Sequence, residues 1–230
     1  MLTIENIKAA AAIRESLTSW DDADNGLDRI RQHFPRNTEN SDVLVKASAI
    51  DKLYSTRAGN IYWVADAVVD AMREEERLRS SGETMSEIEL VDMISRHKRR
   101  RHPKAHRCAS FASKYCHFFV AGREFPIYDS FALAAVNQVL GKRQRGLTPN
   151  RSEYRDFCER IARVRTRDGL EHVGTRELDR FLWLWGQWLA QQGNTERVIN
   201  SDVYEALFES TNREILQHVQ ALKPQIERME

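Results

Sequence analysis

The chain has 230 residues, which is enough for one large domain or two small ones. Apolar residues make up 41% of it, ample for a packed core, and 35 basic side chains face 34 acidic ones. A net charge of +1 identifies no partner by itself, so the position of the charges along the chain has to be considered.

Three classes of protein are disfavoured by the remaining composition. The three cysteines, Cys108, Cys116 and Cys158, lack close pairing, so we expect no disulfide framework and a reducing compartment. No stretch approaches the roughly 18 apolar residues of a membrane span. The N-terminus also lacks the basic region and the long apolar run of a signal peptide. We therefore expect a cytoplasmic protein that is not inserted in a membrane.

Apolar residues recur at helical spacing along the whole chain, and the alternation typical of strands is scarce. Ser86 and Glu89 have the spacing of a capping box. The pattern predicts an all-α protein, interpreted as a single helical domain over residues 1–230, with a division into two lobes left open. In chain order, the predicted helices lie near residues 3–19, 24–34, 42–54, 61–77, 86–96, 108–119, 129–140, 151–166, 175–191 and 202–222.

A basic run at residues 96–107 separates two amphipathic helices. It holds seven Lys or Arg residues, three His and no acid, and Pro103 predicts a turn within it. Such a hairpin presents backbone N–H groups and cations together, which suits phosphate oxygens. The alternative is a solvated loop or a patch for an acidic protein partner. The candidate DNA-binding residues are Lys98, Arg99, Arg100, Arg101, Lys104, Arg107 and Ser110, with Lys142, Arg143 and Arg145 in a second basic loop at 141–150.

A polar stripe follows on the predicted helix 108–119. Ser110, Ser113, Lys114 and His117 are spaced i, i+3, i+4 and i+7, so they share one face of the helix. One interpretation places a lysine and two hydroxyls beside a substrate. The other is an ordinary solvated face.

The segment Phe-Pro-Ile-Tyr-Asp-Ser-Phe at residues 125–131 places an aspartate where an apolar turn ends and a helix begins. Asp129 or Ser130 can act there simply as an N-cap. The helix dipole also favours the ionised carboxylate, which can stabilise a developing cation or orient a water molecule. Asp129 is therefore the candidate catalytic carboxylate.

The order of these features resembles the helix-hairpin-helix DNA glycosylases, the superfamily of the 8-oxoguanine and adenine excision enzymes. The segments 109–119 and 125–131 are also similar to bacterial proteins akin to 8-oxoguanine glycosylases. The resemblance covers about residues 85–140. It implies a helix-hairpin-helix glycosylase-like fold, a hairpin that binds the DNA backbone, a catalytic aspartate at Asp129 and, in bifunctional members, a lysine that attacks the sugar.

The chain departs from this family at two places. The Gly-x-Gly of the hairpin is replaced by His102-Pro103-Lys104. Counted back from Asp129, the lysine position of the family falls near Ser110, whereas Lys114 lies one helical turn later and Lys104 lies in the turn. A chain with the aspartate alone would use water as the nucleophile, or would bind DNA without cutting it.

Aromatic residues supply a further candidate feature. Tyr62, Trp63, Trp183, Trp185 and Trp188 can stack on an extruded base, although aromatics at helical spacing are more often core. Trp185 lies on the apolar face of its predicted helix, and Trp183 and Trp188 lie off it.

The sequence also lacks the motifs of common cofactor sites. The cysteines and histidines lack the spacing of a metal site, and no Walker, Rossmann or nucleophile-elbow motif occurs. We expect neither a metal nor a small-molecule cofactor.

The leading interpretation is a DNA-repair-type N-glycosylase, a hydrolase that flips a damaged purine out of double-stranded DNA. Asp129 would be its catalytic carboxylate and Lys114 an amine near the sugar. The sequence does not define whether a lysine nucleophile is used, nor the oligomeric state. The alternatives are a non-catalytic DNA-binding module of a defence or stress system, and a helical adaptor that binds acidic proteins.

Overall fold

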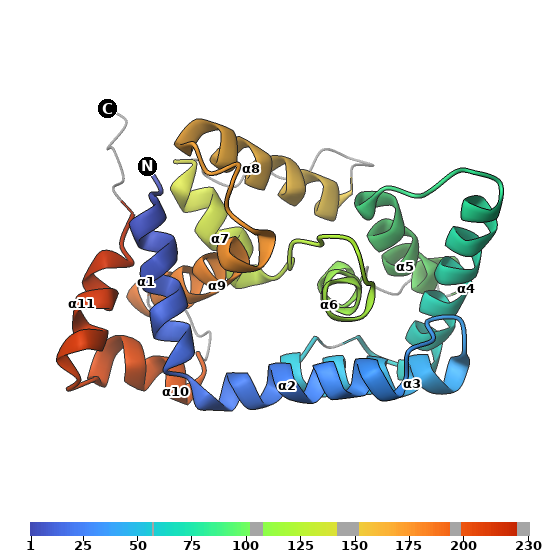
Figure 1. Cartoon of the computed structure of the whole chain (residues 1–230), viewed down its shortest axis with the longest axis horizontal. Helices are drawn as coiled ribbons and strands as arrows, with labels where there is room; N and C mark the ends of the chain where they lie inside the picture. The colour runs from blue at the N-terminus through green and yellow to red at the C-terminus, as the bar shows by residue number, and fades with distance from the viewer. Residues whose placement is uncertain (57, 102–107, 142–151, 194–198, 225–230) are drawn as a thin grey trace. The chain divides into compact units, whose positions relative to one another are not determined.

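Every regular element among the described residues is helical, which confirms the predicted all-α class. The computed structural model describes residues 1–56, 58–101, 108–141, 152–193 and 199–224, and only the backbone of 97–101. Its helices (Figure 1) are α1 (Ile4–Glu15), α2 (Thr18–His33), α3 (Asn40–Tyr54), α4 (Ile61–Ser80), α5 (Glu87–Arg101), α6 (Ala109–Phe119), α7 (Ser130–Val139), α8 (Glu153–Asp168), α9 (Thr175–Gln192), α10 (Ser201–Tyr204), the π-helical turn η1 (Glu205–Glu209) and α11 (Arg213–Ala221).

Polar side chains fix where several helices begin, because the first amides of a helix lack intrahelical acceptors. Asn60 caps α4 by accepting hydrogen bonds from the amides of residues 62 and 63, at 3.0 and 3.3 Å. The predicted capping box of α5 is confirmed. The Ser86 amide donates to Glu89 Oε2 at 2.8 Å, and the Glu89 amide donates to Ser86 Oγ at 3.3 Å.

The chain divides into two compact units. Unit 1 comprises residues 1–22, 129–151 and 156–230. Unit 2 comprises residues 23–128 and 152–155.

Unit 2 is built from α3, α4, α5 and α6. Helix α3 packs on α4 and α6, and α5 also packs on both α4 and α6. Apolar side chains at helical spacing fill the centre of the unit, where Ile50, Val68, Leu90 and Phe111 are fully buried. This core holds α6 in place, and α6 carries the polar stripe.

Unit 1 is organised around α9, which packs against α1 and α7, while α11 covers α1. Helices α7 and α9 approach closely at Gly186, where an added Cβ would lie 2.2 Å from the carbonyl oxygen of Phe131. Near the other end of α7, Trp185 Nε1 donates to Gln138 Oε1 at 2.6 Å. At position 186, only a glycine permits the close approach of the backbones of α7 and α9.

Several helix boundaries differ from the prediction. Helix α2 begins at Thr18 and not near residue 24, and α5 continues to Arg101 and does not end near residue 96. The predicted helix 3–19 ends at Glu15, because the chain turns at Ser16 and begins α2 at Thr18. The predicted helix 202–222 is three pieces. Its break lies at Ser210, whose backbone is extended, and Asn212 then caps α11 by accepting from the Glu214 amide at 2.9 Å. Local hydrogen-bonding residues therefore override the continuous apolar pattern at Ser16 and at Ser210.

Candidate functional site

Lys114 and Ser110 meet on one face of α6. The lysine side chain extends toward the N-terminal end of the helix, as long helical side chains commonly do. Its Nζ donates to Ser110 Oγ at 2.9 Å and lies 5.9 Å from the centre of the Tyr54 ring. Lys114 is only 3% exposed, whereas Ser110 is partly exposed. The amine is thus held near the first turn of α6.

The polar stripe of α6 is not a solvated face. Ser113 is fully buried and Lys114 is nearly so, and His117 is partly buried. Ser113 Oγ accepts a hydrogen bond from the Tyr128 amide at 3.0 Å, and His117 Nδ1 lies 2.8 Å from the carbonyl oxygen of Phe125. The interpretation as an ordinary wet face is therefore wrong for these residues, because part of the stripe binds the loop that follows the helix.

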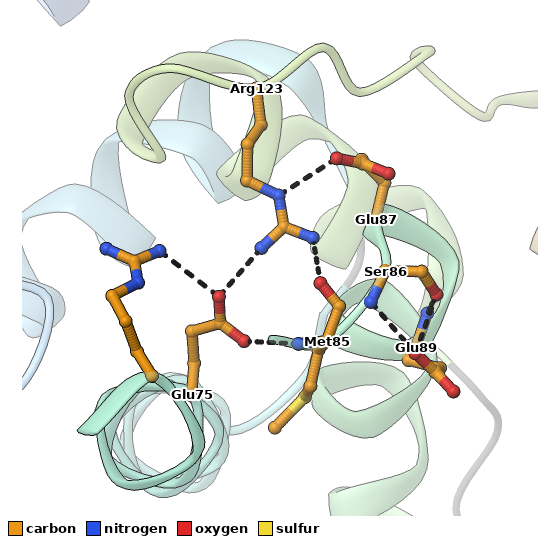
Figure 2. A network of polar contacts seen from close by, with 7 residues as sticks. Glu75, Met85, Ser86, Glu87, Glu89 and Arg123 are labelled. Carbon is orange, nitrogen blue, oxygen red and sulfur yellow. Dashed lines mark hydrogen bonds and ion pairs between the residues drawn. The ribbon is translucent and has the colours of Figure 1, made fainter. Parts of the chain in front are cut away.

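That loop, residues 120–128, is also attached to α4 and α5 through Arg123. Figure 2 shows the guanidinium between two carboxylates: Nη1 donates to Glu75 Oε1 at 3.0 Å, and Nε donates to Glu87 Oε1 at 2.9 Å. Its Nη2 donates to the Met85 carbonyl oxygen, and the Met85 amide donates to Glu75 Oε2 at 2.8 Å. The two buried charges of this cluster, on Glu75 and Arg123, are thus paired with each other.

Further contacts hold the rest of loop 120–128. The Phe125 ring is 1% exposed and lies 5.4 Å from the Arg123 guanidinium. Tyr154 Oη donates to the Pro126 carbonyl oxygen at 3.1 Å. Because side chains from several elements bind successive parts of the loop, its conformation is fixed as far as Tyr128. The next residue of the chain is Asp129.

Asp129 is the N-cap of α7, as predicted. Its Oδ1 accepts hydrogen bonds from the amides of Phe131 at 2.9 Å and Ala132 at 2.8 Å. The side chain is partly exposed. These two N–H donors fix the orientation of the carboxylate at the start of α7.

The other candidate residues are distributed unevenly. Lys114 and Ser110 lie in unit 2, and Asp129 begins the second segment of unit 1. The structure places Lys98, Arg99, Arg100 and Arg101 in the last turn of α5, so this helix continues past residue 96, where the hairpin was predicted to begin. The side chains of these four residues lie outside the described residues, as does the whole of Lys104, Arg107, Lys142, Arg143 and Arg145.

Aromatic side chains have two kinds of environment. Tyr62 is 66% exposed and Trp63 is 37% exposed at the start of α4, so the interpretation as core residues is wrong for this pair. On α9, Trp185 is 2% exposed, as predicted from its face. Trp188 stacks on Trp185 with 4.5 Å between ring centres, and Trp183 meets the edge of Trp20 at 4.6 Å.

A buried lysine on α3 was not identified from the sequence. Lys46 is 1% exposed, and its Nζ donates to the Arg36 carbonyl oxygen at 2.8 Å and to Asn37 Oδ1 at 2.6 Å. Tyr115 Oη donates to the same Asn37 oxygen at 2.8 Å. Burial lowers the pKa of Lys46 to about 8, although nearby Asp42 opposes the shift. The apolar neighbours Val45 and Ala47 give no sign of this role.

The cysteines are reduced, and Cys116 on α6 has no exposed surface. Burial raises the pKa of its thiol well above the ordinary value, although Arg123 acts in the opposite direction. Among the residues that the structure describes, no three His, Cys, Asp or Glu side chains are grouped for a metal ion. No helix in these ranges combines the length and apolar character needed to cross a membrane.

These observations define an all-helical protein with a buried lysine on α6 and an aspartate cap on α7. Residues 5–123, more than half of the chain, match the family model of the HI_0787_N N-terminal domain. The chain therefore belongs to this family. The matched region includes Ser110 and Lys114 and ends at Arg123, before Asp129. Neither the curated proteins nor the solved structures contain a match to the chain.

Proposed function

We propose that the protein is a DNA-binding N-glycosylase of the helix-hairpin-helix type, which removes a damaged purine after flipping it out of the duplex. The basic run at residues 96–107, which begins within α5 and precedes α6, would bind backbone phosphates. Asp129 would be the catalytic carboxylate, and Lys114 would supply an amine near the sugar.

The order of elements around α6 is the observation that carries this proposal. Helix α5, the basic run and α6 are followed by the anchored loop 120–128 and then by α7, which opens with the capping carboxylate of Asp129. The resemblance to the glycosylases rests on the same order. The contacts of Ser113 and Arg123 support the proposal further, because they fix the chain immediately before the aspartate.

The chemistry assigned to Asp129 needs an anion. Departure of the base leaves positive charge on the sugar ring, and a fixed carboxylate nearby lowers the energy of that charge or removes a proton from the attacking water. The amides of residues 131 and 132 hold the carboxylate in one orientation. A preorganised group of this kind does not have to reorient during the reaction.

The test is release of bases from a panel of duplexes that each carry a single lesion, with the wild-type protein and two variants. Asp129→Asn and Asp129→Ser both keep an N-cap acceptor but remove the charge, so both should remain folded. We expect release by the wild type and a loss of about a hundredfold or more in both variants. Asp129→Ala shows separately what loss of the cap costs, about 1 kcal/mol of unfolding free energy.

A non-catalytic DNA-binding module is the second candidate, because capping α7 is by itself a sufficient role for Asp129. This function predicts duplex binding without base release by the wild-type protein. Release that persists unchanged in both Asp129→Asn and Asp129→Ser would instead contradict the assignment of the carboxylate.

A further inference from the structure

We infer that Tyr62 and Trp63, at the start of α4, form a stacking platform for the unpaired bases of a single strand that adjoins the DNA duplex. The inference deepens the proposed function and rests on it, because it takes DNA as the partner. An aromatic ring can stack on any base, so the platform is indifferent to sequence. It would direct the protein to duplexes that end in, or are interrupted by, a single-stranded segment.

Both rings are open to solvent, which separates this role from that of a pocket for a flipped base. Tyr62 is 66% exposed and Trp63 is 37% exposed, whereas the next two residues of α4, Val64 and Ala65, are buried. A base that is flipped out for chemistry is enclosed in a tight pocket. Rings on an open surface instead suit the bases of a strand that is already unpaired, since these bases stack without being enclosed.

The backbone beneath the two rings is fixed before any ligand arrives. Asn60 Oδ1 accepts hydrogen bonds from the amides of both aromatic residues. The turn that precedes Asn60 is held by Asp51, whose Oδ1 accepts from the Ala58 amide at 2.9 Å and from Thr56 Oγ1. A base that stacks on the platform therefore does not have to order the backbone that carries it, which lowers the entropic cost of binding.

The platform lies at the same end of the α4–α5 helix pair as the basic run at residues 96–107. The two helices pack together and are joined by a short connection, so they run in opposite directions (Figure 1). At the connection, the Met85 amide donates to Glu75 Oε2 and fixes the register of the pair. From this contact α4 extends back to Ile61 and α5 extends forward to Arg101, about 20 Å in each case at 1.5 Å per residue. The first turn of α4 is therefore level with the last turn of α5.

The charges at this end favour a polyanion as the partner. The last four residues of α5, 98–101, are all Lys or Arg, and no acidic residue occurs between Asp92 and Glu124. The first turn of α4 also carries no acid. Acids follow at the partly exposed residues Asp66 and Asp70, so the strand should cross the end of α4 and not follow its length. Aromatic rings combined with cations are the means by which proteins hold single strands.

The test compares two labelled DNA probes that share one duplex sequence. The first has blunt ends, and the second carries a single-stranded overhang of about ten nucleotides. Fluorescence anisotropy gives the Kd of the full chain for each probe. We expect the wild type to bind the overhang probe about fivefold or more tightly than the blunt probe, because at least one base stacks. Equal affinity for the two probes would overturn the inference.

Variants separate stacking from attraction to the added phosphates. Tyr62→Ala and Trp63→Ala should each weaken binding to the overhang probe about fivefold to a hundredfold and leave binding to the blunt probe unchanged. Tyr62→Phe and Trp63→Phe should keep most of the affinity, because a ring remains. Circular dichroism checks that these variants of exposed residues stay folded. No loss in either alanine variant would refute the platform.

Leu53→Ala is the matched control. Leu53 is 44% exposed near the end of α3, in the same unit, but it has no ring on which a base can stack. We expect its affinity for both probes to equal that of the wild type. A loss as large as that of Trp63→Ala would show general apolar contact and contradict stacking.

A contact between copies of the chain is the other use of an exposed aromatic pair, since such residues are enriched at protein interfaces. Sedimentation velocity of the free protein distinguishes the two uses. If the wild type self-associates, and the double variant Tyr62→Ala with Trp63→Ala is monomeric with unchanged DNA affinity, the inference is refuted.

The failure of this inference can be told apart from the failure of the proposed function. Base release from lesion duplexes without a preference for the overhang probe would refute the platform and leave the glycosylase proposal in place. A preference for the overhang that is lost in Tyr62→Ala and Trp63→Ala, without release from any lesion, would refute the glycosylase proposal and support the platform.

Discussion

Gly186 of α9 and Phe131 of α7 touch through their backbones, since a Cβ at position 186 would lie 2.2 Å from the Phe131 carbonyl oxygen. Gly186→Ala should therefore lower the unfolding free energy, although alanine is the better helix former. We expect a loss of about 1–3 kcal/mol from the forced separation of the two helices. Urea unfolding, followed by circular dichroism, measures it.

Gly26→Ala is the matched control, because Gly26 lies inside α2 and an added Cβ would meet nothing within 4 Å. There the same change should stabilise the protein by about 0.5–1 kcal/mol. Equal effects at positions 26 and 186 would contradict the close contact.

Removal of Arg123 should leave Glu75 as an incompletely compensated charge in the interior. Arg123→Met should cost about 3 kcal/mol, and adding Glu75→Gln to it should recover part of the loss, because the buried charge is then gone. Thermal unfolding of the two single variants and the double variant gives the coupling energy. Additive losses would show that the two side chains do not interact.

Arg77→Met provides the comparison. Its partner Glu74 and the arginine itself are both solvent-accessible, with side-chain exposures of 35% and 65%. Such pairs contribute about 0–1 kcal/mol, so this variant should unfold at nearly the wild-type temperature.

Lys46 should make stability depend on pH in the alkaline range. Its pKa falls from 10.5 to about 8 on folding, because burial disfavours the charged amine. Between these values the unfolded chain binds more protons than the folded one, so stability gained from this residue rises with pH, by at most about 1.4 kcal/mol per pH unit. Below pH 8 both states are protonated and the gain is absent.

The measurement is the difference in unfolding free energy between wild type and Lys46→Met at pH 7, 8, 9 and 10. Taking the difference cancels the opposite contributions of Cys116 and Tyr115, whose pKa values are raised by burial. A difference that stays flat across this range would show that Lys46 keeps its ordinary pKa.

The basic run at residues 96–107 should contribute strongly to DNA affinity. Replacing Arg99, Arg100 and Arg101 with alanine should weaken binding to duplexes of any sequence and reduce the dependence of log Kd on log salt by about 0.9 for each lost phosphate contact. Fluorescence anisotropy at several salt concentrations measures both. The control replaces the exposed residues Arg29, Arg31 and Arg36 with alanine, which removes the same charge from unit 2. Equal losses in the two triple variants would point to net charge alone.

Much of the architecture could be predicted because it depends on local patterns. Apolar spacing located most helices, and short polar signals such as Ser86 with Glu89 and Asp129 at α7 located their ends. The same spacing could not show the break at Ser210, because a helix that ends and restarts within a few residues keeps its apolar period.

The candidate site was predictable only in part. The stripe on α6 was correctly assembled from its spacing, but its burial depends on residues distant in sequence, since loop 120–128 covers Ser113 through Tyr128. Nothing in the sequence joins Arg123 to Glu75, because 48 positions separate them. The contact between Tyr54 and Lys114 was not predictable for the same reason, because α3 and α6 meet only in the folded unit.

The fully buried thiol of Cys116 can serve as a reporter of motion. With no exposed surface and a thiol whose pKa is raised by burial, it should resist alkylating reagents as long as α6 stays packed. Cys158 is partly exposed and should react directly. The slow labelling of Cys116 would then record how often the helix that carries Lys114 opens, without any engineered probe.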